Sequence, residues 1–501
     1  MISTRRAAAA LSLVFLAAAG PACAARTAAT AADRAPAAAA SQRLGEDLDR
    51  IFGTAPADRV LWGVAVREAG GRLLYRRDST RLLHPASTMK LVTLAAAVER
   101  LGWDFRFETT VRPTTGLEAG GLIRGDLVVT GAGDPSIGRT HGGAATLAAW
   151  ADHLWGLGVR RIEGRIIGDG SAFGGTTLGS GWQWDDLAAA YAAPVSALSY
   201  NENTVELLIA PGPSEGALAA VTVVDPGGGI ALSNAIRTVS GDSARRLSVE
   251  RSATRGGATS LRGEVPVGYA PFKLSLAVAD PPLYFARAFR EALRARGIAV
   301  VGEARSADTD PPGPFPAGAE VMLRHRSPPL RELAVRLMKV SQNLYAELFL
   351  QAVAAAAQAR PAEALAPMFA AWGISRGGIV VADGSGLSRY DLITADALDV
   401  VLARMFEDPA AREPWLAALP VAGVDGTLER RMKGTAAEGR VHAKTGSIAY
   451  VRGLAGYARR PDGRWIQFVI LGNNFAVTMT AADVDRVIES AVLRLLAADG
   501  V

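Results

Sequence analysis

The sequence predicts an α/β domain that is interrupted by a β-rich insertion. Near the N-terminus, apolar residues recur at helical spacing at Leu44, Leu48 and Phe52, and two alternating segments follow. Between residues 107 and 276, short alternating segments are separated by glycine-rich turns such as Gly227-Gly228-Gly229, a pattern typical of β-modules. Helical patterns return after residue 281. With 501 residues, 49% of them hydrophobic and 21% charged, the chain can bury more than one core.

Changes in composition and pattern give the predicted boundaries. Residues 1–24 have the features of a signal peptide, and residues 25–40 form an alanine-rich linker without a periodic pattern. Two segments, 41–106 and 277–501, are expected to form one domain. The insertion between them spans residues 107–276, and we expect two nested modules in it.

Hydrophobic periodicity places the main elements within these segments. The helix that opens at Ser87 is expected to end at Leu101, because Gly102 is a typical helix stop. Further helices are predicted at 41–52, 144–157, 281–296, 330–339, 344–359 and 481–497. Strands are predicted at 60–67 and 72–76, and 441–458 is expected to pair with 464–471.

The N-terminus and the charge balance indicate an exported protein. Arg5 and Arg6 precede the apolar run Ala7–Ala19, which is too short to span a bilayer, and no later run is longer and equally apolar. Cys23 is the only cysteine, so a mature chain would have neither a disulfide nor a thiolate metal site. A net charge of +5 is too small and scattered to indicate nucleic-acid binding. We expect a periplasmic or otherwise extracytoplasmic protein, free or loosely attached to the membrane.

The first candidate site is Ser87-Thr88-Met89-Lys90. A serine and a lysine three residues apart at the start of a helix lie on one face, one turn apart. A serine hydroxyl needs a neighbouring base, and a lysine becomes one when its pKa falls. The chain has only five lysines among its 54 basic residues, the other 49 being arginines. Lysine scarcity favours a role for Lys90 that arginine cannot perform, such as giving up its proton.

Two later clusters contain further scarce lysines. Ser341-Gln342-Asn343 follows Lys339 and lies between two predicted helices. Lys444-Thr445-Gly446-Ser447 lies on a predicted strand and holds the only Lys-Thr-Gly in the chain. A second Ser-x-Asn, Ser199-Tyr200-Asn201, shows that this short pattern alone is weak evidence.

The ordered series Ser-x-x-Lys, Ser-x-Asn and Lys-Thr-Gly resembles the penicillin-recognising serine acyl-transferases, that is, penicillin-binding proteins and serine β-lactamases. The first two motifs are 254 residues apart, and this interval resembles the D-alanyl-D-alanine carboxypeptidase/endopeptidase family S13, the class C low-molecular-mass penicillin-binding proteins. Gln342 departs from the family, in which many members carry Asp. Other segments that resemble the family are 131–135, 181–186, 193–198, 383–389 and 424–428.

The resemblance implies a penicillin-binding-protein-like domain, an antiparallel sheet flanked by helices, and roles for its motifs. Ser87 would attack the bond between two D-alanines and form an acyl-enzyme. Lys90, held neutral by burial and by nearby Lys444, would take the proton, while Ser341 relays a proton and Asn343 holds the substrate amide or Lys90. Lys444 would attract the terminal carboxylate. Thr445, Gly446 and Ser447 would border the substrate, and the backbone N–H groups of Ser87 and Ser447 would form the oxyanion hole.

The resemblance also suggests that Arg389 and Asp169 recognise the stem-peptide side chain. The alternative is that Arg389 braces its loop and Asp169 caps a turn. Lys339 is assigned only a supporting electrostatic role.

The expected ligands are peptidoglycan stem peptides as substrates and β-lactams as covalent inhibitors. No cofactor is expected, and the five histidines lack the spacing of a metal site. The sequence leaves open a carboxypeptidase or an endopeptidase that cuts D-alanyl cross-links. It also leaves open a serine β-lactamase and a non-catalytic wall-binding module, although the long insertion and the intact motifs disfavour these two.

Overall fold

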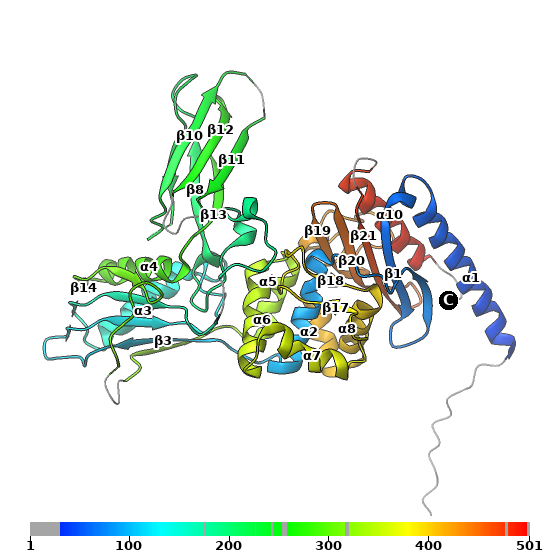
Figure 1. The fold of residues 1–501 in the computed structure, drawn as a ribbon, viewed down its shortest axis with the longest axis horizontal. Helices are drawn as coiled ribbons and strands as arrows, with labels where there is room; N and C mark the ends of the chain where they lie inside the picture. Colours follow the sequence, from blue (N-terminus) through cyan, green and yellow to red (C-terminus); the bar gives the residue numbers. More distant parts are fainter. Residues whose placement is uncertain are drawn as a thin grey trace, which may run out of the picture.

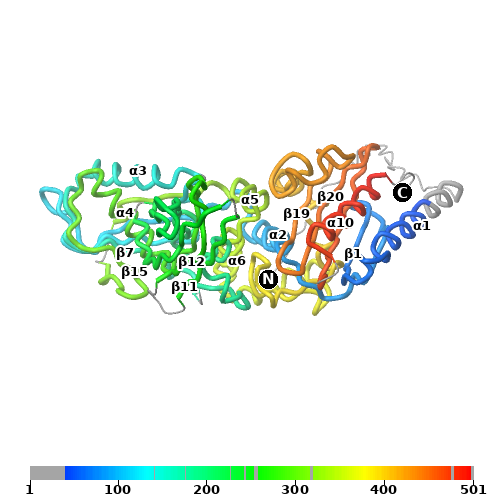
Figure 2. The backbone as a smooth tube through the Cα atoms, turned by 90° about the horizontal axis from the view of Figure 1, so that it is seen from above, coloured from blue at the N-terminus to red at the C-terminus, as the bar shows by residue number. Residues whose placement is uncertain are grey.

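The computed structural model describes residues 31–497, except 175–176, 226, 242–243, 253–257, 316–319 and 476–478. One end of the elongated molecule contains an antiparallel sheet between two helical layers, and the other contains the insertion (Figure 1, Figure 2). The sheet has five strands in the order β19-β20-β21-β1-β2. Their bounds are β1 (Leu61–Glu68), β2 (Leu73–Arg77), β19 (Val441–Ile448), β20 (Val451–Arg459) and β21 (Trp465–Asn473).

Both faces of this sheet are buried, because successive side chains of a strand point to opposite faces. Ala65 belongs to the core on the α2 and α8 side, while its neighbours Val64 and Val66 belong to the core that includes α1 and α10. The α/β domain with an antiparallel sheet flanked by helices is thus confirmed. The helices of this domain are α1 (Ala31–Gly53), α2 (Met89–Leu101), α5 (Leu330–Lys339), α6 (Asn343–Ala357), α7 (Pro361–Ala371), α8 (Ala395–Glu407), α9 (Pro409–Ala418) and α10 (Ala481–Leu496).

Helix α2 is the central helix of the domain. It packs against α5, α6 and α8, and every residue from Met89 to Ala97 is buried. The helix ends where predicted, at Leu101, because Gly102 adopts φ 82°, which is accessible to glycine without strain. Its burial fixes its first turn, which carries Lys90, and the 3₁₀ segment directly before it, which carries Ser87.

The insertion contains two parts that differ in their strand pairing (Figure 1). The first combines helices α3 (Gly143–Gly156) and α4 (Pro281–Arg296) with a five-stranded sheet, β15-β7-β5-β3-β16, and a small sheet, β14-β6-β4. The second lies within it in sequence and contains two three-stranded sheets, β13-β8-β9 and β10-β12-β11. The strands of the first part are β3 (Glu108–Pro113), β4 (Leu122–Ile123), β5 (Leu127–Thr130), β6 (Arg161–Ile162), β7 (Ile166–Asp169), β14 (Ala299–Val300), β15 (Ala304–Ser306) and β16 (Leu323–Arg326). Those of the second are β8 (Thr204–Ala210), β9 (Ala220–Val223), β10 (Leu232–Val239), β11 (Arg246–Arg251), β12 (Thr259–Pro266) and β13 (Phe272–Ala277).

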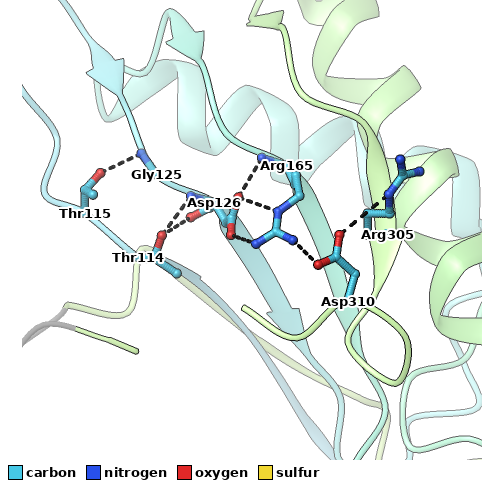
Figure 3. A network of polar contacts seen from close by, with 7 residues as sticks. All are labelled: Thr114, Thr115, Gly125, Asp126, Arg165, Arg305 and Asp310. Carbon is cyan, nitrogen blue, oxygen red and sulfur yellow. Dashed lines mark hydrogen bonds and ion pairs between the residues drawn. The ribbon is translucent and has the colours of Figure 1, made fainter. Parts of the chain in front are cut away.

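The boundary predicted at residue 277 is wrong, because the chain stays in the insertion until about residue 326. Strand β15 pairs with β7, and β16 pairs with β3. Ion pairs also join residues after 277 to the insertion. Arg165 forms ion pairs with both Asp126 and Asp310 (Figure 3). The Asp126–Arg165 contact is 2.6 Å long. The helix at 281–296 was predicted correctly, but sequence periodicity does not reveal which core a helix joins.

Two further expectations are wrong, and a third concerns residues that the structure does not describe. Residues 31–40 belong to α1 rather than to a linker, since alanine is the best helix former. The segment 441–458 is not one strand but two, β19 and β20, which pair with each other across residues 449–450. The predicted signal peptide and residues 25–30 lie outside the described residues. None of the helices in the described part is both long and apolar enough to cross a membrane.

Candidate active site

Ser87 lies in a tight turn, and two glycines from other parts of the chain lie close against it. The turn is a short 3₁₀ segment (Ala86–Thr88) directly before α2. A Cβ on Gly386 would lie 1.8 Å from the carbonyl oxygen of Ala86, and one on Gly446 would lie 2.7 Å from that of Pro85. Glycine at these positions therefore lets a loop and strand β19 come close to the backbone of the turn.

Lys90 is fully buried one helical turn after Ser87. Its Nζ lies 2.8 Å from Ser87 Oγ, 2.7 Å from Asn343 Oδ1 and 2.8 Å from the carbonyl oxygen of Ser385. The amide and carbonyl oxygens can only accept hydrogen bonds, so each takes one N–H of Lys90. A neutral amine has two N–H groups and one lone pair, which leaves the lone pair for the Ser87 hydroxyl. With this geometry, the neutral amine can accept the Ser87 proton.

Burial lowers the pKa of Lys90 to about 7, while the carboxylates of Asp383, Glu347 and Asp391 oppose this shift. Burial, and after it the charge of Asp383, also raise the pKa values of Glu347 and Asp391. Asp383 and Asp391 belong to the 382–391 loop, whose Ser385 carbonyl contacts Lys90, and Glu347 of α6 bonds to the same loop.

The acids also shape this loop through its backbone. Glu347 accepts N–H groups of Gly384 and Ser385 at 2.9–3.1 Å. Asp383 accepts those of Ser385, Gly386 and Ser388 at 2.6–3.0 Å. The sequence-based site lacked Glu347, although an acid within the apolar helix run Tyr345–Phe349 is a usable signal.

The second motif lies between α5 and α6 and has a strained backbone. Ser341 adopts φ 60°, a left-handed conformation that is costly for a non-glycine residue. Asn343 begins α6, and its side chain is held at both ends: Oδ1 accepts from Lys90, and Nδ2 donates to the carbonyl of Tyr191 at 2.8 Å. Asn343 therefore contacts Lys90, as one of the two roles predicted for it requires.

The third motif lies on β19. Lys444 is fully buried, and its Nζ donates to Ser341 Oγ at 2.8 Å and to the carbonyl of Thr445 at 2.9 Å. Burial lowers the pKa of Lys444 well below its usual value, and the charge of Lys90 lowers it further. Thr445 shares a hydroxyl hydrogen bond of 2.9 Å with Thr427. Lys339 pairs with Asp425 at 2.7 Å, which ties the same loop to α5.

These three motifs surround a cleft of about 410 Å³. Ser87, Ser341 and Asn343 line it from one side and Ser447 from β19, and Arg389 lies at the same cleft. The described residues that line it are Ser87, Gln183, Asp186, Tyr191, Ser341, Asn343, Gly386, Leu387, Arg389, Ser447, Ile448 and Ala449.

Asp169 is not among the described residues that line this cleft, and its role in recognition stays a prediction. It ends β7, accepts the N–H of Ser171 at 3.0 Å and the Thr130 hydroxyl at 3.3 Å, and thus caps its own turn. The acid at the cleft is Asp186, which accepts a hydrogen bond from the Tyr191 hydroxyl. Asp186 belongs to the segment 181–186, in which the sequence already resembled the family.

Comparison with known proteins assigns the chain to a family. The sequence model of the D-Ala-D-Ala carboxypeptidase 3 (S13) family matches residues 44–498. The chain belongs to the S13 family. The resemblance predicted from the three motifs is therefore confirmed, and the chain is a serine-type D-Ala-D-Ala carboxypeptidase.

Individual S13 relatives cover most of the chain. The D-alanyl-D-alanine carboxypeptidase of Actinomadura sp. (strain R39) is 34% identical over 454 residues, which are 86% of this chain and 81% of that protein. The D-alanyl-D-alanine carboxypeptidase DacB of Haemophilus influenzae is 29% identical over 78% of this chain and 80% of its own length. The crystal structure of penicillin-binding protein 4 (dacB) from Haemophilus influenzae superposes with a TM-score of 0.77 at 26% identity, over 90% of this chain and 99% of that chain.

Metal ligands do not gather in this or any other part of the described chain. Among the described residues, no group of three His, Cys, Asp or Glu side chains is arranged to hold a metal ion.

Proposed function

We infer that Ser87 is the nucleophile and Lys90 its general base in hydrolysis of the terminal D-Ala-D-Ala bond of peptidoglycan stem peptides. The observation that carries this proposal is the environment of Lys90 Nζ. Two acceptors occupy both N–H groups of the neutral amine, and its third contact, at 2.8 Å, is Ser87 Oγ. The pKa of about 7 leaves a substantial neutral fraction near neutral pH.

The reaction follows from the positions around the cleft. Lys90 takes the Ser87 proton as Oγ attacks the carbonyl carbon between the two D-alanines. The backbone N–H groups of Ser87 and Ser447 stabilise the oxyanion, each contributing roughly 2.7–4 kcal/mol by the magnitude measured in a serine protease. Ser341 relays to the leaving amine the proton that Lys90 took from Ser87, so Lys90 returns to its neutral form and the terminal D-alanine departs. Water then hydrolyses the ester, which restores the Ser87 hydroxyl and releases the shortened peptide as its acid.

Lys444 binds the terminal carboxylate of the substrate. Lys444 is buried, and no carboxylate is among the groups that shift its pKa. The carboxylate of a bound substrate would supply this missing negative charge and favour the charged form of Lys444. The Thr445 and Ser447 hydroxyls add hydrogen-bond donors, and Gly446 lets β19 approach Ser87.

Arg389 and Asp186 recognise a zwitterionic end of the stem peptide. They carry opposite charges and line the same cleft as Ser87. Arg389 Nη1 donates to the carbonyl of Ala449 at 3.0 Å, and the Tyr191 hydroxyl fixes Asp186. A free amino-carboxylate group matches this pair in charge.

Labelled penicillin tests the proposal, with Ser87→Ala alongside the unmodified chain. A long-lived adduct that depends on Ser87 supports a D,D-peptidase that β-lactams inhibit. Rapid turnover of the drug would instead identify a β-lactamase, and no adduct at all would exclude both enzymes. Release of D-alanine from a pentapeptide, measured beside cleavage of a D-alanyl cross-link, separates carboxypeptidase from endopeptidase activity.

We also propose that the chain acts outside the inner membrane, where its polymeric substrate lies. The leader-like residues 1–24 support this placement. Fractionation of cells that express the full chain, with labelled penicillin to locate the enzyme, tests it.

A further inference from the structure

A strained turn of the insertion faces the second motif. Asn201, Glu202 and Asn203 have φ values of 49°, 56° and 55°, three successive non-glycine residues in the left-handed region. This conformation is normally occupied by single residues, because each L-residue in it is strained. Such a run persists only where the surrounding contacts impose it.

The two asparagines supply those contacts inside the insertion. Asn201, 4% exposed, donates to Asp225 at 3.2 Å and to the Tyr284 hydroxyl at 3.1 Å. Asn203, fully buried, donates to the carbonyl of Pro194 at 2.8 Å. With both neighbours anchored, the position of Glu202 between them is fixed.

Glu202 reaches across to the catalytic domain. One of its carboxylate oxygens accepts from Arg336 Nε at 2.6 Å, and the other accepts from Gln342 Nε2 at 2.5 Å. The Glu202 and Arg336 side chains are only 18% and 24% exposed, so solvent screens the pair less than a surface ion pair. Arg336 lies in the last turn of α5, directly before the second motif.

The Gln342 side chain links Glu202 to the start of α6, because both polar groups of its amide form hydrogen bonds. Its Nε2 donates to Glu202, while its Oε1 accepts the N–H of Leu344 at 2.9 Å and caps α6. Gln342 is the middle residue of the motif, between the strained Ser341 and Asn343. Fixing its side chain therefore restricts the turn that aims Ser341 Oγ at Lys444 and Asn343 Oδ1 at Lys90.

We propose that Glu202 is a positioning residue for the reaction: through Gln342, it holds the Ser341–Asn343 turn in its reactive geometry. The proposal rests on the function proposed above and adds to it a role for the insertion in acylation. Misplacing reacting groups by about 1 Å costs on the order of 100-fold in rate. Loss of the Glu202 contact is thus expected to slow acylation while noncovalent binding of the β-lactam changes little.

The test uses the full chain and separates the acylation rate constant from the binding constant of the preceding complex. Glu202→Ala is expected to lower the acylation rate constant roughly 10- to 100-fold. Gln342→Glu places a like charge against Glu202 and is expected to slow acylation as well. The double variant Glu202→Gln with Gln342→Glu reverses the amide–carboxylate pair and is expected to recover at least part of the rate.

Glu206→Gln is the matched control. It removes an ion pair of 2.9 Å with Lys273 that lies wholly within the insertion, four residues from Glu202. Wild-type acylation in this control, together with slow acylation and a similar melting temperature in Glu202→Ala, supports the proposal. Wild-type acylation by Glu202→Ala overturns it, and so does equal slowing by Glu206→Gln. Labelling of Ser87→Ala would instead refute the proposed nucleophile, so the two failures are distinguishable.

Discussion

Two lysines behind the serines of the same cleft are equally buried but differently surrounded. Lys90 and Lys444 are both fully buried, and each contacts a serine hydroxyl at 2.8 Å. Around Lys90, three carboxylates oppose the effect of burial, and its pKa stays at about 7. No carboxylate is among the groups that shift the pKa of Lys444, which falls well below its usual value.

In the proposed function, this difference separates the base, Lys90, from the anion site, Lys444. Burial alone removes the charge of a lysine, whereas nearby carboxylates tune its pKa to a value at which it exchanges protons. Lys90 has this compensation built into the protein, as suits a general base. In the proposed function, Lys444 obtains its counter-charge only from the carboxylate of the substrate.

Replacing Lys90 by arginine is expected to have the largest effect of the variants that test this difference. Arg keeps a positive charge but does not release its proton, so the base is lost. The acylation rate should fall about 10²- to 10⁴-fold. The exposed Lys433 provides the matched control, since Lys433→Arg makes the same chemical change away from the cleft. Similar acylation by Lys90→Arg and wild type would remove the distinction between the two lysines.

Replacing Lys444 by alanine is expected to have a smaller effect, confined to ligands with a terminal carboxylate. A hydrogen bond to a charged group contributes about 1.5–3 kcal/mol, so kcat/KM should fall roughly 10- to 100-fold. Amidation of the terminal carboxylate of the peptide should cost wild type a similar factor and cost the variant little. If amidation weakens both proteins equally, Lys444 does not bind that carboxylate.

Replacing Arg389 by alanine is expected to have the smallest effect, because this side chain is partly exposed. KM for a peptide with a free amino-carboxylate side chain should rise about two- to fivefold, the range of exposed ion pairs. A peptide with that side chain blocked should be unaffected. Asp186→Asn should show the same preference, and the same comparison in Asp169→Asn tests the role predicted for Asp169 from the sequence. Equal effects on the free and blocked peptides would indicate that Arg389 only braces its loop.

The motifs could be predicted from sequence because their chemistry depends on scarce residues. Lysine scarcity pointed to Lys90 and Lys444, and local periodicity placed one on a helix and the other on a strand. Both placements hold in α2 and β19. Local patterns were sufficient to predict a helix or strand whose own residues show the hydrophobic period of that element.

Long-range contacts were not predictable in the same way. Residues 281–326 join the insertion through pairing with strands more than 100 residues earlier, which no local pattern records. Asp169 and Asp186 follow similar local rules, and only the fold decides which one reaches the cleft. The bond between Glu202 and Gln342 likewise depends on how two domains meet.

The pH dependence of acylation tests the central claim, that buried Lys90 is the base, most directly. Burial lowers its pKa to about 7, so the amine is neutral above that pH and protonated below it. The second-order rate constant for labelled penicillin is therefore expected to be level above about pH 8 and to fall about tenfold per pH unit below pH 6. Melting temperatures measured at the same pH values separate loss of the base from unfolding. A rate that stays unchanged down to pH 5 in the folded protein would contradict the assignment of Lys90 as the base.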